Sequence, residues 1–308
     1  MRRRRWITGL FGFVLAALPP ADTAAAETIT LTHQGATRSA ILHRPVGAPA
    51  GPRPLVIALH GQGGTGQDFR RWAALDAIAN RGGFAVIYPD AVDGRWSYGR
   101  PIRQPMPTVA GEPADDIGFL RALIAALVAR GIADPSRIYV FGVSRGGLMT
   151  FTAACALDDV IAAGAAIVTG MTDHQREDCR PARAVPLVVI AGTADTTQFY
   201  DGWVFPMGRL LSVPETLEFW RTRHGCGAQE ATVLPHRRRA DPTRVVLVEW
   251  TECATEKPLR YLRVEGGGHQ MPSTAGRSMP LSESKFGRRN HDFETADEAW
   301  AFFKRFAR

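Results

Sequence analysis

The sequence predicts an α/β fold, in which a mostly parallel central β-sheet is covered by helices on both faces. Short apolar runs alternate along the chain with segments of helical periodicity, as expected for parallel strands linked by helices. Some runs, such as LVIAL over residues 55–59, are apolar at every position, which is typical of strands buried on both faces. With 308 residues and 45% hydrophobic content, the chain can bury a large core without a metal or a disulfide.

The expected elements follow one another along the chain. It opens with a hairpin around Gly35, formed by strands over residues 28–32 and 38–43. Apolar runs predict further strands at residues 55–59, 84–88, 138–143, 161–168, 187–191, 245–251 and 259–264. For the helix expected over residues 115–130, Asp115 is a candidate N-cap and Gly131 a stop signal. Helical periodicity predicts helices at residues 67–80, 115–130, from about 146, 214–224 and 295–306.

Two long segments, residues 90–113 and 265–293, lack any regular pattern. Connections of this length within a compact domain are usually functional. No polar linker separates the strand-forming runs, so we expect a single domain over residues 27–308.

The first 26 residues have the layout of a secretory signal peptide. Arg2–Arg5 precede an apolar run over residues 6–18, and three alanines at 24–26 supply the small residues of a cleavage site. A single N-terminal anchor helix is the alternative, although the run is short for a membrane span. The arginine run also allows export by the twin-arginine route. We expect cleavage, no stable membrane anchor afterwards, and a secreted or periplasmic protein.

The charge and the cysteines limit the function further. Removing residues 1–26 takes away four arginines and Asp22 and lowers the formal charge from +7 to +4, which is too mild to argue for nucleic-acid binding. In an oxidising compartment an even number of cysteines predicts disulfides, with three pairings open. Their spacing does not fit a zinc site, and we expect no metal and no cofactor. The four cysteines are Cys155, Cys179, Cys226 and Cys253.

The central motif is G-V-S-R-G over residues 142–146, a G-x-S-x-G pattern. The expected strand 138–143 runs directly into Ser144, and a helix is expected from Gly146. A strand, a sharp turn at serine and a helix form the nucleophile elbow, which needs small residues on either side of the serine. The alternative is an ordinary strand-to-helix turn in which Ser144 caps the helix.

A serine nucleophile needs a base and an orienting carboxylate. Asp195 follows the strand 187–191, and His269 follows the strand 259–264 after three glycines. Both lie beyond carboxyl ends of strands, where open α/β sheets place their sites, and the order Ser, Asp, His suits an elbow serine. The rival acids and histidines are Asp201, Asp173, Asp178, His291, His224 and His174.

The motif H-G-Q-G-G over residues 60–64 also follows a predicted strand. Acyl transfer creates an oxyanion that two backbone N–H groups can stabilise by several kcal/mol. The motif resembles a loop that supplies one of these donors, so we assign them to the N–H groups of Gln62 and Arg145. The alternative, a phosphate-binding glycine loop, lacks the lysine and the spacing of that motif.

Taken together, these motifs resemble the secreted esterases related to polyhydroxybutyrate depolymerases and feruloyl esterases. The resemblance covers nearly all of the chain after residue 26 and is carried by LVIALHGQGGTGQDF, FAVIYPDAVDGRWSYGR, DDIGFLRALI, IYVFGVSRGGLM, GTAD, VPETLEFW and GGGH. It implies an α/β-hydrolase fold with Ser144, Asp195 and His269 as the catalytic triad. It also implies the disulfides Cys155–Cys179 and Cys226–Cys253.

The chain departs from the family pattern at three places. The family usually has Ser-Asn-Gly where this chain has Ser-Arg-Gly at 144–146, and often tryptophan where this chain has Met271. It commonly reads W-N-D-G-R where this chain reads W-S-Y-G-R over 96–100. We expect Trp96, Tyr98 and Met271 to border the substrate, with stacking on a ring as one role for the aromatic pair. A loop anchored by burial of Trp96 is the alternative.

The resemblance and the motifs predict a serine carboxylic-ester hydrolase that works through an acyl-enzyme. Its expected substrates are small or oligomeric: hydroxyalkanoate oligomers, aromatic-acid (feruloyl-type) esters or short-chain acyl esters. With one domain expected, we predict turnover of soluble esters, slow attack on solid polyester, and a monomer. The alternative is a non-catalytic extracellular ligand-binding module that retains the hydrolase fold, and a peptidase is disfavoured by the resemblance.

Overall fold

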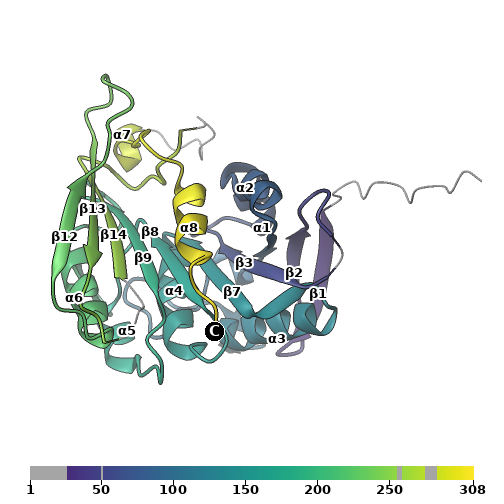
Figure 1. Ribbon diagram of the computed structural model, residues 1–308. Helices are drawn as coiled ribbons and strands as arrows, with labels where there is room; N and C mark the ends of the chain where they lie inside the picture. Colours follow the sequence, from purple (N-terminus) through teal and green to yellow (C-terminus); the bar gives the residue numbers. More distant parts are fainter. Residues whose placement is uncertain (1–25, 50, 255–258, 275–282) are drawn as a thin grey trace, which may run out of the picture.

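The computed structural model describes residues 26–49, 51–254, 259–274 and 283–308, so the predicted signal peptide lies outside the described residues except for Ala26. A ten-stranded sheet forms the centre of the molecule (Figure 1). Six central strands are parallel to one another, and antiparallel strands complete both edges. The spatial order is β1 (Glu27–His33), β2 (Ala36–His43), β4 (Ala85–Pro89), β3 (Arg53–Leu59), β7 (Ala133–Val143), β8 (Ala163–Ile167), β9 (Leu187–Gly192), β14 (Leu259–Glu265), β13 (Arg244–Trp250) and β12 (Gln229–Val233).

Helices cover both faces of this sheet, which confirms the predicted fold class. One face packs on α1 (Gly66–Trp72), α2 (Leu75–Gly82) and α8 (Thr295–Phe303). The other packs on α3 (Asp116–Ala129), α4 (Arg145–Ala156) and α6 (Val213–Arg223), with the short α5 (Asp173–Asp178) nearby (Figure 1).

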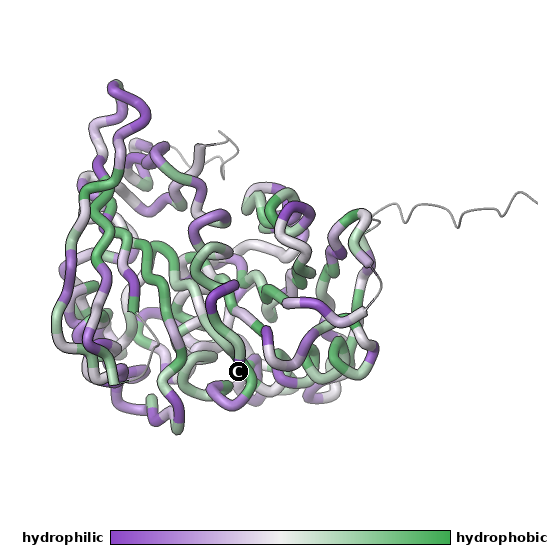
Figure 2. Tube along the Cα trace, viewed as in Figure 1, coloured by the Kyte–Doolittle hydropathy of each residue, from purple (hydrophilic) through white to green (hydrophobic). Residues whose placement is uncertain are grey.

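Strand β3 shows why its sequence is apolar at every position. Leu55, Ile57 and Leu59 belong to the core on one face, whereas Val56 and Ala58 belong to the core on the other. Successive side chains of a strand point to opposite faces, so a strand covered on both sides has no position left for a polar residue. Figure 2 shows the same distribution, with hydrophobic residues along the central strands and hydrophilic residues along the outer loops.

The helix predicted over residues 67–80 is wrong as a single element. The structure breaks it into α1 and α2, because Ala74 adopts a left-handed conformation with φ of 58°. Thr65 caps α1, and its hydroxyl accepts the N–H of Asp68 at 3.1 Å. The apolar periodicity continues across the break, so the pattern did not reveal it.

The segment predicted to be irregular over 90–113 contains the short pair β5 (Thr108–Val109) and β6 (Glu112–Pro113) and the 3₁₀ turn Val92–Gly94. A second small hairpin, β10 (Trp203–Phe205) with β11 (Gly208–Leu210), follows β9 and was not predicted. Edge strand β12 was missed as well, because every one of its side chains is exposed and the apolar signal of a strand is absent.

The structure contains the disulfide bonds Cys155–Cys179 and Cys226–Cys253, the pairing implied by the family resemblance. The first joins the end of α4 to the residue after α5, and the second joins the loop after α6 to the loop after β13. Within the ranges that the structure describes, no helix is long and apolar enough to cross a membrane.

Candidate active site

Ser144 stands at the junction between β7 and α4, where the backbone turns sharply. Its φ of 56° and ψ of −117° lie in a region that residues other than glycine seldom occupy. The turn closes so tightly that a Cβ atom added to Gly142 would lie 2.0 Å from the carbonyl oxygen of Gly146. A Cβ on Gly146 would lie 2.2 Å from the carbonyl oxygen of Leu59 on neighbouring β3. The two glycines of the motif are therefore required by backbone packing, and Ser144 is held at the carboxyl end of its strand.

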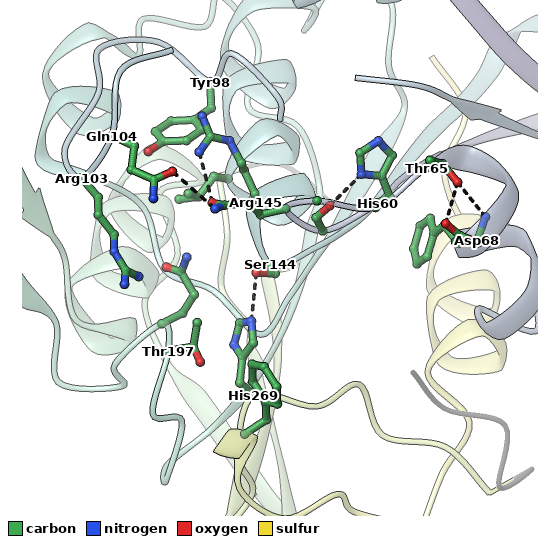
Figure 3. A pocket seen from close by; sticks show the side chains of 18 of the residues that line it. His60, Thr65, Asp68, Tyr98, Arg103, Gln104, Ser144, Arg145, Thr197 and His269 are labelled. Atoms are coloured by element: carbon green, nitrogen blue, oxygen red, sulfur yellow. Dashed lines mark hydrogen bonds between the residues drawn. The ribbon is translucent and has the colours of Figure 1, made fainter. Parts of the chain in front are cut away.

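His269 and Asp195 meet Ser144 at the same edge of the sheet. Their strands, β14 and β9, are parallel neighbours, so the loops that follow these strands lie side by side. His269 Nε2 is 2.9 Å from Ser144 Oγ, and His269 Nδ1 is 2.8 Å from Asp195 Oδ2. The side chains of His269 and Asp195 are 6% and 2% exposed. The three residues predicted to form a triad thus make one continuous chain of hydrogen bonds. Figure 3 shows the bond between Ser144 and His269.

The carboxylate of Asp195 is fixed by backbone donors. Its Oδ1 accepts the N–H groups of Thr197 and Gln198, each at 2.8 Å, which leaves Oδ2 to accept from the imidazole. Hydrogen bonds from backbone N–H groups stabilise the ionised form of a carboxylate. The arrangement holds one imidazole nitrogen toward the acid and the other toward Ser144, as a general base requires.

The glycines before His269 have a packing role. A Cβ atom on Gly192, at the end of β9, would lie 2.2 Å from the carbonyl oxygen of Gly267. A Cβ on Gly268 would lie 2.2 Å from the carbonyl oxygen of Phe286. The backbones that carry the acid and the base therefore approach one another more closely than side chains would permit.

The rival residues have other partners or locations. His291 Nδ1 is 3.0 Å from Asp241 Oδ2, and Asp178 pairs with Arg100. Among the described residues, none of the rival side chains has a hydrogen bond to Ser144, and the cavity beside Ser144 is lined by none of them.

The loop over residues 60–64 lies directly against the serine. A Cβ on Gly61 would be 3.6 Å from Ser144 Cβ, and Gly63 donates its N–H to the carbonyl of Gly94 at 2.8 Å. In the part of the chain that the structure describes, the N–H groups of Gln62 and Arg145 donate to no protein acceptor. Both predicted oxyanion donors are thus left unbonded beside Ser144.

His60 holds this loop in place as a neutral imidazole. Its Nδ1 donates to the carbonyl of Gly61 at 2.7 Å, so Nε2 carries no proton and accepts the N–H of Ala91 at 3.2 Å. Burial lowers the pKa of His60 below its ordinary value, despite the opposing effect of the bond to Gly61. The carbonyl of His60 in turn accepts from the indole N–H of Trp96 at 2.9 Å.

A cavity of about 1050 Å³ opens in front of Ser144 and His269. Its polar side includes Gln62, Gln104 and Gln198, and charged, aromatic and aliphatic side chains also line it. Figure 3 shows Tyr98, Arg103, Gln104 and Arg145 gathered on one side of it. The apolar lining residues are Phe69, Trp72, Ile102, Leu148, Phe205 and Phe286.

Two of the three predicted substrate-bordering residues lie elsewhere, and those two predictions are wrong. Trp96 has no exposed surface and anchors its loop through the bond to His60, which was the alternative for this residue. Met271 packs in the core between the sheet and α8 and does not line the cavity. Only Tyr98 lines it, whereas Phe205 and Phe286 were missed, because nothing in the sequence shows which side chains of a long loop turn inward.

Arg145 has a second feature besides its backbone N–H. Its side chain is turned inward and the residue is 4% exposed, with Nε donating to the carbonyl of Trp96 at 2.9 Å and Nη1 to Gln62 Oε1 at 3.3 Å. The guanidinium lies 4.9 Å from the ring centre of Tyr98. Burial lowers the pKa of Arg145 and raises that of Tyr98.

Comparison with known proteins gives matches among esterases. A sequence model of the family described as esterase PHB depolymerase matches residues 38–195. NocK of Nocardia uniformis subsp. tsuyamanensis, an esterase by name, is 32% identical over 298 residues, which cover 92% of this chain and 83% of NocK. Feruloyl esterase B of Piromyces equi is 26% identical over 70% of this chain, but the match spans 39% of its length. Poly(3-hydroxyalkanoate) depolymerase C of Paucimonas lemoignei is 33% identical over 42% of this chain and 30% of its own.

Solved structures give the fold. An acetyl xylan esterase from Aspergillus awamori superposes with a TM-score of 0.58 over 90% of this chain and 99% of its own, at 16% identity. A thermostable esterase superposes with a TM-score of 0.57 over 92% of this chain and 63% of its own, at 17% identity. The architecture is that of the α/β-hydrolases. Among the described residues, no group of three His, Cys, Asp or Glu side chains could hold a metal ion.

Proposed function

Since this chain belongs to the PHB depolymerase family of esterases and is a carboxylic ester hydrolase, we propose that it works through Ser144, His269 and Asp195. The observation that carries the proposal is the unbroken line of hydrogen bonds from Asp195 Oδ2 through the imidazole of His269 to Ser144 Oγ. The nucleophile, the base and the orienting acid of acyl transfer stand in that relation.

The steps follow from this arrangement. Ser144 Oγ attacks the ester carbonyl carbon while His269 Nε2 takes the hydroxyl proton, and the carboxylate of Asp195 stabilises the imidazolium that forms. His269 then passes the proton to the departing alkoxide, which leaves as the alcohol. Water, activated by the same imidazole, attacks the acyl-enzyme and releases the acid.

The negative charge that develops on the carbonyl oxygen needs donors at a fixed position. We assign them to the N–H groups of Gln62, in the loop that lies against Ser144, and of Arg145, the residue that follows Ser144. A donor of this kind contributes about 3 kcal/mol to transition-state stabilisation in serine hydrolases. The bonds that His60 makes to Gly61, Ala91 and Trp96 support this role, because they fix the loop before any substrate binds.

For the substrate, we propose soluble esters of hydroxyalkanoate oligomers, aromatic acids or short-chain acids. A mixed apolar and polar cavity beside the serine suits acids and alcohols of this size. We also propose that the protein is exported and acts as a monomer outside the cytoplasm. Two disulfide bonds support export, because such bonds persist in oxidising compartments.

Replacing the nucleophile tests the proposal. Ser144→Ala should lower kcat for a short-chain aryl ester by at least about a thousandfold, because losses of this size or larger follow removal of a triad serine. Ser136→Ala is the matched control, since it removes a hydroxyl from the opposite end of β7, far from His269. A folded Ser144→Ala protein that kept more than a few per cent of wild-type kcat would refute the assignment.

A further inference from the structure

The guanidinium of Arg145 is a buried positive charge without a negative partner. Its hydrogen bonds go to the carbonyl of Trp96, the amide oxygen of Gln62 and the sulfur of Met106, all of them neutral. Within the described ranges no carboxylate lies within ion-pair distance of it. A buried charge costs free energy unless an opposite charge compensates it, so a residue placed in this way is suited to meet an anion.

Most of the other charged side chains around the cavity are also positive. Arg103 and Lys285 line it as well, and neither forms an ion pair with a described residue. The acidic residue among the lining is Asp68, which already pairs with Arg71 at 3.1 Å. Figure 3 shows Arg103 and Arg145 on the side of the cavity opposite to Asp68. The cavity therefore presents uncompensated positive charge beside the reaction centre.

The arrangement is built into the fold and is not a mobile surface charge. The side chains of Arg145, Gln62 and Gln104 are joined by hydrogen bonds of 3.3 Å and 3.4 Å, and the ring of Tyr98 lies against the guanidinium. Gln62 and Arg145 also carry the backbone donors assigned to the oxyanion. A charge recognised here is thus tied to the position of the scissile carbonyl.

We propose that Arg145 and Arg103 form a subsite for a carboxylate carried by the ester substrate itself. Arg145 supplies a fixed, desolvated charge, and Arg103, which is exposed at the rim, attracts the anion and completes the contact. Among the proposed substrates, the favoured ones are esters that bear a free carboxylate in either the acid or the alcohol half. This inference rests on the proposed function, because it names the substrate class of that same site.

Two pairs of isosteric esters test it. Monomethyl succinate carries the carboxylate in the acid half, and methyl levulinate replaces that carboxylate with a neutral acetyl group. The pair 3-acetoxypropanoate and 4-acetoxybutan-2-one does the same for the alcohol half. For at least one pair, kcat/KM of the wild-type protein should be about tenfold higher for the anionic ester at low ionic strength and should fall toward the neutral value with added salt. The pair that responds identifies the half that carries the anion.

Variants then locate the charge. Arg103→Gln should lower the ratio of anionic to neutral kcat/KM about fivefold, as expected for one partly solvated ion pair. Arg305→Gln removes the same charge from the exposed segment after α8. Arg305 neighbours Phe306, whose carbonyl bonds to Tyr139 on β7, and it does not line the cavity, so this variant should leave the ratio unchanged. Arg145→Lys, which keeps the charge but loses the planar guanidinium, should lower the ratio as well.

A wild-type ratio near or below one for both pairs would overturn the inference, as would equal losses in Arg103→Gln and Arg305→Gln. If both neutral esters are hydrolysed through Ser144 while no charge preference appears, the subsite is absent and the esterase mechanism stands. If none of the four esters is hydrolysed, the proposed function itself fails.

Discussion

Ser144, Asp195 and His269 each follow a strand of the central sheet within four residues, whereas most of the cavity wall that faces them comes from the connections between strands, including helices α1 and α4. Backbone contacts shorter than a side chain would allow, at Gly142, Gly146 and Gly192, fix the first region. Side-chain burial and single hydrogen bonds, such as the one from the Trp96 indole to the His60 carbonyl, fix the second. The residues proposed for the chemistry are therefore positioned by the sheet, and most of the wall proposed to contact the substrate comes from connections that can change without disturbing the sheet.

The largest effect is expected where backbones meet. Gly146→Ala would place a Cβ atom 2.2 Å from the carbonyl oxygen of Leu59, so β3 and α4 must move apart. We expect the free energy of unfolding to fall by about 3 kcal/mol and the esterase activity to be lost with it. Denaturant unfolding and aryl-ester turnover measure the two effects.

Gly131→Ala is the matched control for Gly146→Ala. Its backbone is left-handed, with a φ of 65° that is unfavourable for alanine, whereas Gly146 lies within helix α4, and the space around Gly131 is open. The expected cost is about 1 kcal/mol, with activity retained. Equal stability losses for the two variants would show that steric packing does not fix the elbow.

The second prediction compares an alanine substitution in the core with an alanine substitution in the cavity wall. Met271→Ala should lower the free energy of unfolding by about 2 kcal/mol and leave KM near its wild-type value, because the side chain packs between the sheet and α8. Phe205→Ala should raise KM about tenfold with a smaller loss of stability, because Phe205 lines the cavity and is partly exposed. A raised KM for Met271→Ala, together with an unchanged KM for Phe205→Ala, would show that Met271 contacts the substrate and Phe205 does not.

The division between the sheet and the connections also explains how much the sequence could predict. That Ser144, Asp195 and His269 lie together could be predicted because each stands just after an apolar run typical of a strand, and parallel strands bring their carboxyl ends to one edge of the sheet. Trp96 and Met271 were misplaced because the direction of a side chain in a long loop depends on tertiary packing. Phe205 was not found, since each strand of the hairpin that presents it is three residues long, too short for an alternating or helical period to be recognised.

A third and smaller prediction separates loss of the fold from loss of catalysis in acid. Burial lowers the pKa of His224 to about 4 in the folded protein, against 6.5 for the free side chain. Below pH 6.5 His224 is protonated in the unfolded chain but stays neutral in the folded chain. The contribution of His224 to the free energy of unfolding, which is present above pH 6.5, is therefore lost as the pH falls toward 4. Between pH 7 and pH 5.5 this site should lower the free energy of unfolding by about 1 kcal/mol.

His224→Gln removes the titrating group, so the variant should lose about 1 kcal/mol less than the wild type over the same interval. The acid dependence of kcat/KM should be the same in both proteins, because His224 caps the C-terminus of α6 and does not line the cavity. Chemical denaturation at the two pH values measures the difference. Identical pH dependence of the free energy of unfolding in the two proteins would show that His224 does not contribute to the loss of stability in acid.

The claim that Ser144 is a nucleophile activated by His269 is tested most directly by a fluorophosphonate probe with peptide mass mapping. The serine oxygen attacks phosphorus and fluoride leaves, so only an activated serine is labelled under mild conditions. We predict one label per chain, on the peptide that contains Ser144, and much slower labelling of a folded His269→Ala variant. A folded wild-type protein that stays unlabelled, or that is labelled at another serine, would contradict the claim.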